Sequence, residues 1–411
     1  MKKNVLILAT LTLIFSNSLF AQDSTNVEKK DKPMLYTIGY NRVPEGFNLP
    51  LIGVINVAYG NHTGLQLGFA NRNSGDFRGL EIGFANAVGG SMNGSQIAVF
   101  NAVGRSTNGL TVGLFNAVGN ETIGCQIGLF NATGNKSNGV NVGFLNATGN
   151  SVNGVQVGFL NTTGNKVHGI QIGFTNILGN KFDGFQAGFV NIQGNEFIGG
   201  QVGFVNIIGN KILGTQVGFV NIDGNKVEGV QIGFLNKIHS LSGFQLGFIN
   251  LLDTVSAGVP VGFFTLVKHG GYQAIELGTS EMYPVNLSFK TGTRSFYTSL
   301  IASYGSDMNN PYAFGVGVGT IVPLGTGFSF NPELTSQSTF FNSWNQLYSL
   351  HINVLYAFSS HFSLVAGPTL VWNHLNRSVD FQQPVFALYQ TELDANNKLV
   401  VGLKAAVRYE F

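Results

Sequence analysis

The sequence predicts an all-β protein in which a repetitive β-solenoid of 15-residue coils precedes an antiparallel β-barrel of about eight strands. Three observations lead to this fold class. A motif of the form GxQxGFxN returns at every fifteenth position through the middle of the chain, and apolar and polar residues alternate along the C-terminal third. Charged residues make up only 10% of the chain, against about 25% in ordinary soluble domains. This composition favours a β-rich, partly membrane-embedded protein over a soluble enzyme.

The N-terminal segment 1–21 has the pattern of a secretory signal peptide. Lys2 and Lys3 precede a largely apolar run from Val5 to Phe15. The run is too short for a spanning helix, so an uncleaved anchor is the weaker alternative, and we expect an exported protein. Without the two lysines of this segment, the 22 basic residues fall to 20 and equal the 20 acidic ones. This balance gives no reason to expect a nucleic-acid partner.

The repeats span residues 49–270, after a predicted N-terminal linker at 22–48. Asparagine recurs at every fifteenth position from Asn56 to Asn236, and glycine stands three positions before nearly all of these asparagines. Self-similarity at a fixed period indicates an architecture in which each unit packs against its neighbours. In the unit "GVQVGFLN", Gln156 and Gly158 alternate with Val157 and Phe159, as in a strand, and the following "TGN" is typical of a turn.

Two architectures fit this period. In a β-solenoid each unit is one coil, and equivalent side chains stack in ladders. In the alternative, each unit is one wall strand of a single large outer-membrane barrel that acts as a pore or transporter. Outer-membrane barrels alternate short and long connections, whereas here every connection has the same length. The equal spacing favours the solenoid.

The solenoid implies two files of amide side chains. The asparagines are expected to form a structural ladder at a corner of the coil, in which each amide bonds to the next asparagine and to backbone groups: Asn131, Asn146, Asn161, Asn176, Asn191, Asn206 and Asn221. The evenly spaced glutamines are the best candidates for an interaction surface, for example toward a glycan: Gln126, Gln156, Gln171, Gln186, Gln201, Gln216 and Gln231. The competing interpretation is that the glutamines stack and bond to one another.

The repeated "GxQxGFxNxxGN", closing with "GVPVGFFTLVKHGG" at 258–271, resembles a largely uncharacterised family of bacterial surface-repeat proteins. The resemblance covers roughly residues 49–270, and it implies a location at the cell surface rather than an activity. A more distant resemblance is to the stacked-repeat heads of trimeric autotransporter adhesins, whose long coiled-coil stalk has no counterpart in this sequence.

Residues 271–411 are predicted to form an outer-membrane-type β-barrel. The segment "KLVVGLKAAVRYEF" at 398–411 alternates throughout, and it resembles the closing strand of outer-membrane barrels. Aromatic residues at expected strand ends, such as Tyr312, Trp372 and Tyr409, suit interfacial girdles. The candidate strands are 284–290, 295–304, 312–322, 327–335, 346–358, 361–373, 384–391 and 398–411. A soluble β-sandwich is the alternative for this part of the chain.

The sequence does not decide on which side of the outer membrane the repeats lie. An eight-stranded barrel is filled by its own side chains, so we expect no wide pore. An even number of strands brings both ends of the barrel to the periplasmic side, which would place the repeats in the periplasm. The resemblance to surface-repeat proteins implies the opposite. The expected location is therefore the outer membrane of a Gram-negative-type bacterium, with the repeats either at the surface or in the periplasm.

The sequence contains no pattern typical of catalysis, cofactor binding or metal binding. The seven histidines lack metal-ligand spacing, and "GVGVGT" at 315–320 lacks the lysine of a phosphate loop. Cys125 is the only cysteine and is expected to be a buried apolar side chain. An enzyme site in the C-terminal domain is an alternative that no residue pattern favours.

We therefore predict a non-enzymatic outer-membrane protein without a cofactor. Its repeat module would serve a structural or adhesive interaction, and its barrel would be the anchor. The expected partners are the outer membrane and a glycan or protein surface. The oligomeric state stays open.

Overall fold

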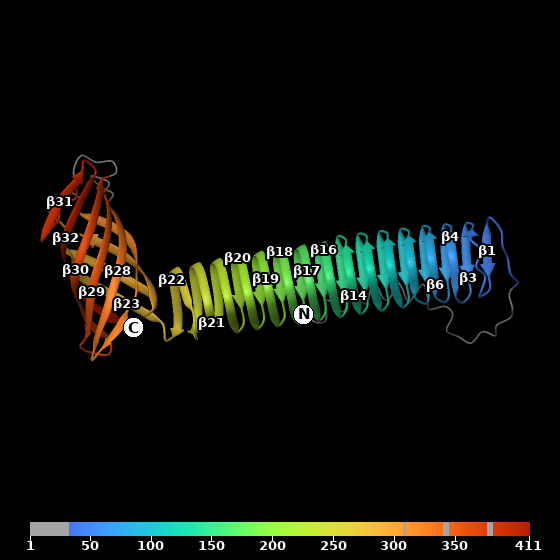
Figure 1. Ribbon diagram of the computed structural model, residues 1–411, viewed down its shortest axis with the longest axis horizontal. Coiled ribbons are helices and arrows are strands. Elements are labelled where there is room, and N and C mark those ends of the chain that lie inside the picture. The colour runs from blue at the N-terminus through green and yellow to red at the C-terminus, as the bar shows by residue number, and fades with distance from the viewer. Residues whose placement is uncertain (1–32, 307–309, 340–344, 376–380) are drawn as a thin grey trace. The chain divides into compact units, whose positions relative to one another are not determined.

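The computed structural model describes residues 33–306, 310–339, 345–375 and 381–411, and their regular elements are all β-strands. None of these residues forms a helix long and apolar enough to cross a membrane. The predicted signal peptide lies outside the described residues. The chain divides into two compact units, Met1–Gly218 and Phe219–Phe411. From Tyr40 onward the first unit consists of repeats, and the second contains the last repeats and the barrel (Figure 1).

Each repeat forms one coil of a β-solenoid, as predicted. The early coils consist of two short strands, and from Ser151 onward these merge into one longer strand. The strands are β1 (Tyr40–Val43), β2 (Leu51–Ile52), β3 (Ile55–Ala58), β4 (His62–Leu67), β5 (Ala70–Asn73), β6 (Phe77–Ile82), β7 (Ala85–Val88), β8 (Met92–Ile97), β9 (Phe100–Val103), β10 (Ser106–Val112), β11 (Phe115–Val118), β12 (Glu121–Ile127), β13 (Phe130–Thr133), β14 (Lys136–Val142), β15 (Leu145–Thr148), β16 (Ser151–Thr163), β17 (Lys166–Leu178), β18 (Lys181–Gln193), β19 (Glu196–Ile208), β20 (Lys211–Asp223), β21 (Lys226–Val255) and β22 (Val259–His269).

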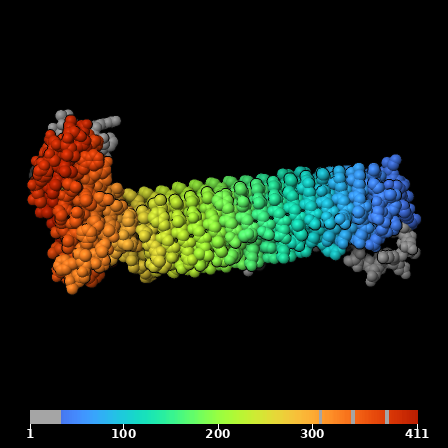
Figure 2. Space-filling model, viewed as in Figure 1, coloured from blue at the N-terminus to red at the C-terminus, as the bar shows by residue number. Residues whose placement is uncertain are grey.

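Neighbouring coils pair in parallel, and equivalent positions of successive repeats lie opposite each other. Between β16 and β17, Gln156 pairs with Gln171 and Asn161 with Asn176. Within the second unit, β21 and β22 are also parallel. In the first unit, Figure 1 shows the coils as arrows lying side by side, and Figure 2 shows them as successive ridges of side chains. Parallel pairing cannot build the wall of an antiparallel barrel, so the alternative of one large barrel with the repeats as wall strands is wrong.

The stack begins inside the segment 22–48, which the sequence predicts to be a linker. β1 pairs in parallel with β3, and the side-chain amide of Asn41 donates to Oδ1 of Asn56 at 2.7 Å. This first coil starts at Tyr40 rather than at residue 49. The motif cannot be recognised in this first coil because Ile38 and Pro44 occupy the positions where most of the other repeats have glycine.

The interior of the coils holds amide side chains together with apolar ones such as Val152 and Val167, and other apolar side chains cover much of the exterior. In the coil that β16 forms, Gln156 and Asn161 are buried, whereas Val157 and Phe159 are exposed. The predicted alternation is therefore present, with the polar side turned inward. Gly158 belongs to the inward side and leaves room for the amides that stack there.

Two glycines of the motif are required by the close approach of the coils. A Cβ atom at Gly158 would lie 2.3 Å from the backbone oxygen of Gly143 and 2.7 Å from the side-chain nitrogen of Asn146. Gly154 has a φ of +138°, in the region that favours glycine, and a Cβ there would lie 2.1 Å from the backbone oxygen of Gly139. The recurrence of both glycines follows from these contacts.

An antiparallel β-barrel follows the repeats. Its strands are β23 (Tyr272–Thr279), β24 (Val285–Thr293), β25 (Phe296–Tyr304), β26 (Tyr312–Gly319), β27 (Val322–Gly325), β28 (Phe328–Thr339), β29 (Asn345–Ala357), β30 (Phe362–Leu375), β31 (Tyr389–Asp394) and β32 (Asn397–Glu410). Eight of them form a closed ring in the order β23–β24–β25–β26–β28–β29–β30–β32, and β32 pairs back with β23. The fold class is therefore the one that the sequence predicts.

One of the candidate barrel strands is wrong. The segment 384–391 contributes only to β31, which pairs with β32 and stands outside the closed ring. The missing wall strand is β23, which precedes the first candidate at 284–290. The strand is short, and its inward Glu276 gives it no purely apolar face.

The barrel turns apolar side chains outward and polar ones inward. In β23, Ile275 and Leu277 are exposed and Glu276 is buried. In β29, Ile352 is exposed and Asn353 is buried. This alternation is the pattern of transmembrane β-barrels.

Aromatic pairs lie near both ends of the barrel strands. The ring centroids of Tyr348 and Trp372 are 5.4 Å apart near one end. Those of Phe362 and Tyr409 are 5.0 Å apart near the other. Two aromatic belts of this kind mark the interfaces of outer-membrane barrels.

Candidate interaction surface and barrel interior

The recurrent asparagines form a ladder inside the coils. Nδ2 of Asn161 donates to the backbone oxygen of Ile172 and to Oδ1 of Asn176, both at 2.9 Å. In the second unit, Nδ2 of Asn221 lies 2.8 Å from Oδ1 of Asn236. Such mutual bonding satisfies polar groups that water cannot reach. The residues predicted for the ladder, all buried, are Asn131, Asn146, Asn161, Asn176, Asn191, Asn206 and Asn221.

The glutamine file is buried as well, contrary to the prediction of an interaction surface. Nε2 of Gln171 donates to Oε1 of Gln156 at 2.8 Å, and Nε2 of Gln186 donates to Gln171 at 2.8 Å. The strand alternation places these side chains on the inward side, where those from Gln156 to Gln216 bond to one another as the competing interpretation holds. They present no surface to a glycan or a protein. The residues with 0% exposure are Gln126, Gln156, Gln171, Gln186, Gln201, Gln216 and Gln231.

The outward side of the motif carries a continuous aromatic row instead. We call it the phenylalanine file, which in the first unit contains Phe144, Phe159, Phe174, Phe189 and Phe204. Neighbouring rings stack with centroids 4.8–5.0 Å apart and interplanar angles of 0–9°. Their exposed fractions lie between 45% and 52%. A row of half-exposed apolar rings is the most extensive candidate interaction surface of the repeats.

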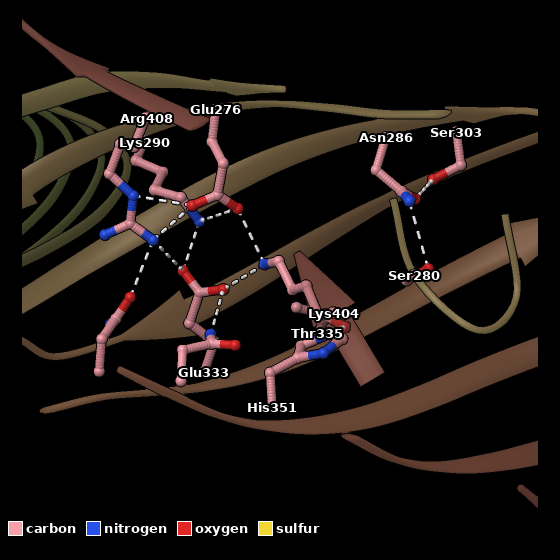
Figure 3. Close-up of polar contacts among 12 residues, drawn as sticks. Glu276, Ser280, Asn286, Lys290, Ser303, Glu333, Thr335, His351, Lys404 and Arg408 are labelled. Atoms are coloured by element: carbon pink, nitrogen blue, oxygen red, sulfur yellow. Dashed lines mark hydrogen bonds and ion pairs between the residues drawn. The ribbon is translucent and has the colours of Figure 1, made fainter. Parts of the chain in front are cut away.

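Five charged side chains form a cluster of ion pairs inside the barrel (Figure 3). Glu276 and Glu333 face Lys290, Lys404 and Arg408, and no side chain among them is more than 11% exposed. Nζ of Lys404 lies 2.8 Å from Oε1 of Glu276 and 2.9 Å from Oε2 of Glu333. Nε of Arg408 donates to Glu276 at 2.7 Å, and Lys290 is paired with Glu333. Each carboxylate therefore contacts several cations, a condition under which buried charges are tolerated.

The charged cluster leaves little free space in the lumen. A cavity of about 30 Å³ lies beside Glu276, Lys290, Glu333 and Lys404. This volume accommodates about one water molecule. At the level of the cluster, the side chains of the described residues close the barrel.

Within the described ranges, no group of three or more His, Cys, Asp and Glu side chains is arranged to hold a metal ion. Nε2 of His351 lies 3.2 Å from Oγ1 of Thr335 inside the barrel, and Nδ1 of His168 lies 3.2 Å from Asp183 on the exposed edge of a coil. Cys125 is only partly buried, because its position in the coil is the outward one that Val155 has in β16.

Neither the phenylalanine file nor the acidic half of the charged cluster was predicted from the sequence. The file was visible as a recurrent Phe at a single position of the motif. The cations were visible as Lys404 and Arg408 on one face of the last strand, which implies acidic partners within the barrel. Glu276 lies 132 residues from Arg408 along the chain, and spacing alone could not identify it.

No protein-family model and no curated protein matches the chain. Among solved structures, the crystal structure of Neisserial surface protein A (NspA) matches with a TM-score of 0.20 and 13% sequence identity. The match covers 34% of this chain and 94% of that one. The interpretation of the barrel therefore depends on its own strands and side chains.

Proposed function

We propose that the protein is a non-enzymatic outer-membrane protein, anchored by the barrel, whose repeats form a module for structural or adhesive interaction. The observation that carries the proposal is the closed ring of strands with an apolar exterior and a charged interior. A soluble β-sandwich would place its apolar side chains between two sheets. A ring that buries Glu276, Glu333 and Arg408 and exposes Leu277 and Ile352 suits a lipid environment instead.

A pore or transporter is the less favoured function. The parallel repeats cannot widen the barrel, and the cavity beside the charged cluster has a volume of only about 30 Å³. We expect no ion conductance from the purified protein in planar bilayers. Stable single-channel currents would favour the pore.

We also propose that the repeats lie on the periplasmic side. The ring begins at Tyr272 and its last strand ends at Glu410, at the end where the segments 294–295, 320–327 and 358–361 join the strands. The segments 280–284, 305–311, 340–344 and 376–396 join them at the opposite end, and 376–396 is the longest of these connections. Outer-membrane barrels have short periplasmic turns and longer extracellular loops.

A contact of the last repeat supports the same assignment. Oγ1 of Thr298, close to the short turn at 294–295, donates to the backbone oxygen of Phe263 at 3.2 Å. The final coil therefore packs at the short-turn end of the barrel. This proposal departs from the surface location that the sequence resemblance implies.

Membrane insertion can be tested with one matched pair of variants. Val316 faces outward midway along β26, and Leu393 is exposed on β31, outside the ring. An arginine facing the middle of a bilayer costs about 2–4 kcal/mol. We expect the native chain to enter the outer-membrane fraction and to migrate as a heat-modifiable folded band. Val316→Arg should weaken that band, and Leu393→Arg should not. Recovery of the native chain as a soluble protein would contradict the proposal.

A further inference from the structure

We propose that the repeats of two copies of this chain pair side by side and in parallel along the phenylalanine file. The pairing follows from the geometry of the repeats. Only the parallel orientation rests on the proposed function, because anchoring in one membrane inserts every copy in the same direction.

The outward apolar surface is large enough for a stable interface. A Phe side chain buries about 200 Å², so a half-exposed ring offers about 100 Å² and the five rings roughly 500 Å². Val157 and Ile172, which are 36% and 44% exposed, widen the row. Toward the N-terminus the same position continues with exposed Phe69, Phe84, Leu114 and Leu129. The total exceeds the largest apolar patch of a typical monomer, about 300–600 Å², and reaches the roughly 800 Å² that each partner contributes to a standard interface.

The stacking of the rings limits what can bind to them. Both faces of Phe159 are covered, by Phe144 at 4.8 Å and by Phe174 at 4.9 Å between centroids. Only the ring edges point outward. Cations bind the face of an aromatic ring, and a sugar stacks on the same face. The file therefore suits neither a cationic ligand nor a glycan, and it suits an apolar partner.

The spacing of the file points to an identical partner. Its rings recur every 4.8–5.0 Å, which is the distance between neighbouring strands. A partner that contacts successive ring edges over many coils must have the same spacing, and a second copy of the solenoid has it. Rows of identical side chains that pack against each other with this repeat form the dry interfaces of steric zippers. A lipid chain has no such period.

The charges of the repeats do not oppose this pairing. In β17 and the turn that follows it, the stretch from Ile170 to Asn180 contains no charged residue. Lys181 and Glu196 lie on the turn edge of successive coils, away from the file, and are paired there at 2.9 Å. Two copies can therefore meet along the file without the like-charge repulsion that excludes wrong partners.

The test is cysteine cross-linking of the full chain in isolated outer membranes. On a Cys125→Ser background, one variant carries Phe159→Cys on the file and the control carries Asn153→Cys, which is exposed elsewhere on the same coil. Packed β-sheets lie about 10 Å apart, so a bifunctional maleimide of that reach should link two copies at position 159. We expect a covalent dimer from Phe159→Cys and little from Asn153→Cys.

Equal, low cross-linking at both positions would overturn the proposal. So would a Cys at position 159 that is shielded from a simple maleimide but forms no dimer, because a lipid or another protein would then cover the file. If the protein is recovered in the soluble fraction and the same reagent links position 159 there, the anchoring fails and the pairing stands.

A second pair of variants separates pairing from folding. Phe159→Asp with Phe174→Asp places charges on the file, and Asn153→Asp with His168→Asp places them at a position where the next coil already has Asp183. Cross-linking through Phe189→Cys should fall at least tenfold with the first pair and remain with the second. Protease resistance of the repeats should be the same in both. Unchanged cross-linking with the first pair would contradict the proposal.

Discussion

Nδ2 of Asn161 lies 2.9 Å from Oδ1 of Asn176, and the two residues occupy the same place in successive coils. The glutamines run in the opposite sense, since Gln171 donates back to Gln156 at 2.8 Å. The solenoid is therefore held along its length by two rows of buried amides that donate in opposite directions. Their alignment explains why the period of the repeat is kept so strictly.

The asparagine ladder should be sensitive to a single substitution. Asn161→Ala removes the acceptor of Asn146 and the donor to Asn176, and a buried polar group without its partner costs about 1–3 kcal/mol. We expect the repeats to become accessible to protease at a lower urea concentration, with cleavage near β16 and β17. Asn165→Ala is the control, because Asn165 belongs to a less buried row and bonds to Asn150 at 3.1 Å. Equal effects of the two variants would contradict a special role for the inner ladder.

Two glycines should respond differently to the same change. Gly158→Ala places a Cβ atom 2.3 Å from a backbone oxygen of the preceding coil, and overpacking of this kind costs about 1–3 kcal/mol or more. At Gly200 a Cβ atom would approach only the side chain of Phe185, at 3.2 Å. We expect Gly158→Ala to lower the urea midpoint of the repeats and Gly200→Ala to leave it nearly unchanged. Similar midpoints for both would contradict the close packing of the coils.

A buried acid should make the first coils sensitive to alkaline pH. Glu81 occupies the position of the glutamine file, and burial raises the pKa of its carboxyl to about 8, partly offset by the bond from Gln96 at 2.6 Å. Folding therefore favours the protonated form. The free energy of unfolding should be highest below the ordinary pKa of 4.5 and should fall by about 1.4 kcal/mol per pH unit until pH 8.

Glu81→Gln is the matched variant for this prediction, because glutamine stands at the same position in the neighbouring coils. We expect it to remove the pH dependence of protease cleavage around β6 and to stabilise these coils at pH 9. A native protein whose first coils are equally stable at pH 5 and pH 9 would contradict the burial of this carboxyl.

The barrel should depend on Glu333, one of the two acids of the charged cluster. Glu333→Ala leaves Lys290 and Lys404 without one partner each, and breaking a buried ion pair costs about 3–5 kcal/mol. The folded, heat-modifiable band should disappear at a lower urea concentration. Glu392→Ala on the exposed strand β31 serves as the control. Unchanged stability of Glu333→Ala would show that the cluster does not hold the barrel together.

The sequence predicted the coil and its period because one short pattern is repeated many times. It did not predict which side of the coil faces inward. Apolar side chains are normally the buried ones, yet Gln156 and Asn161 are inside and Phe159 is outside. Stacking lowers the usual penalty for burying an amide, since the donors of Asn161 and Gln171 meet acceptors of neighbouring coils. That outcome depends on contacts between coils, which no single repeat reveals.

In the barrel, the alternation of the last strand was readable, and β32 has Leu403 outward and Arg408 inward. The strand β23 could not be recognised from the sequence, because the acidic Glu276 in its middle is stabilised only by the ion pairs with Arg408 and Lys404. Such long-range ion pairs decide which short segment completes the ring. The first coil was missed for a similar reason, since Asn41 reveals its role only through the bond to Asn56.

The placement of the repeats is tested most directly by thiol labelling of intact and permeabilised cells. On the Cys125→Ser background, Lys166→Cys marks the exposed edge of a coil, and Ser306→Cys marks the connection 305–311 at the opposite end of the barrel. If the repeats lie in the periplasm, a membrane-impermeant maleimide should label position 306 in intact cells and position 166 only after permeabilisation. Labelling of position 166 in intact cells would contradict the periplasmic placement and would place the repeats outside.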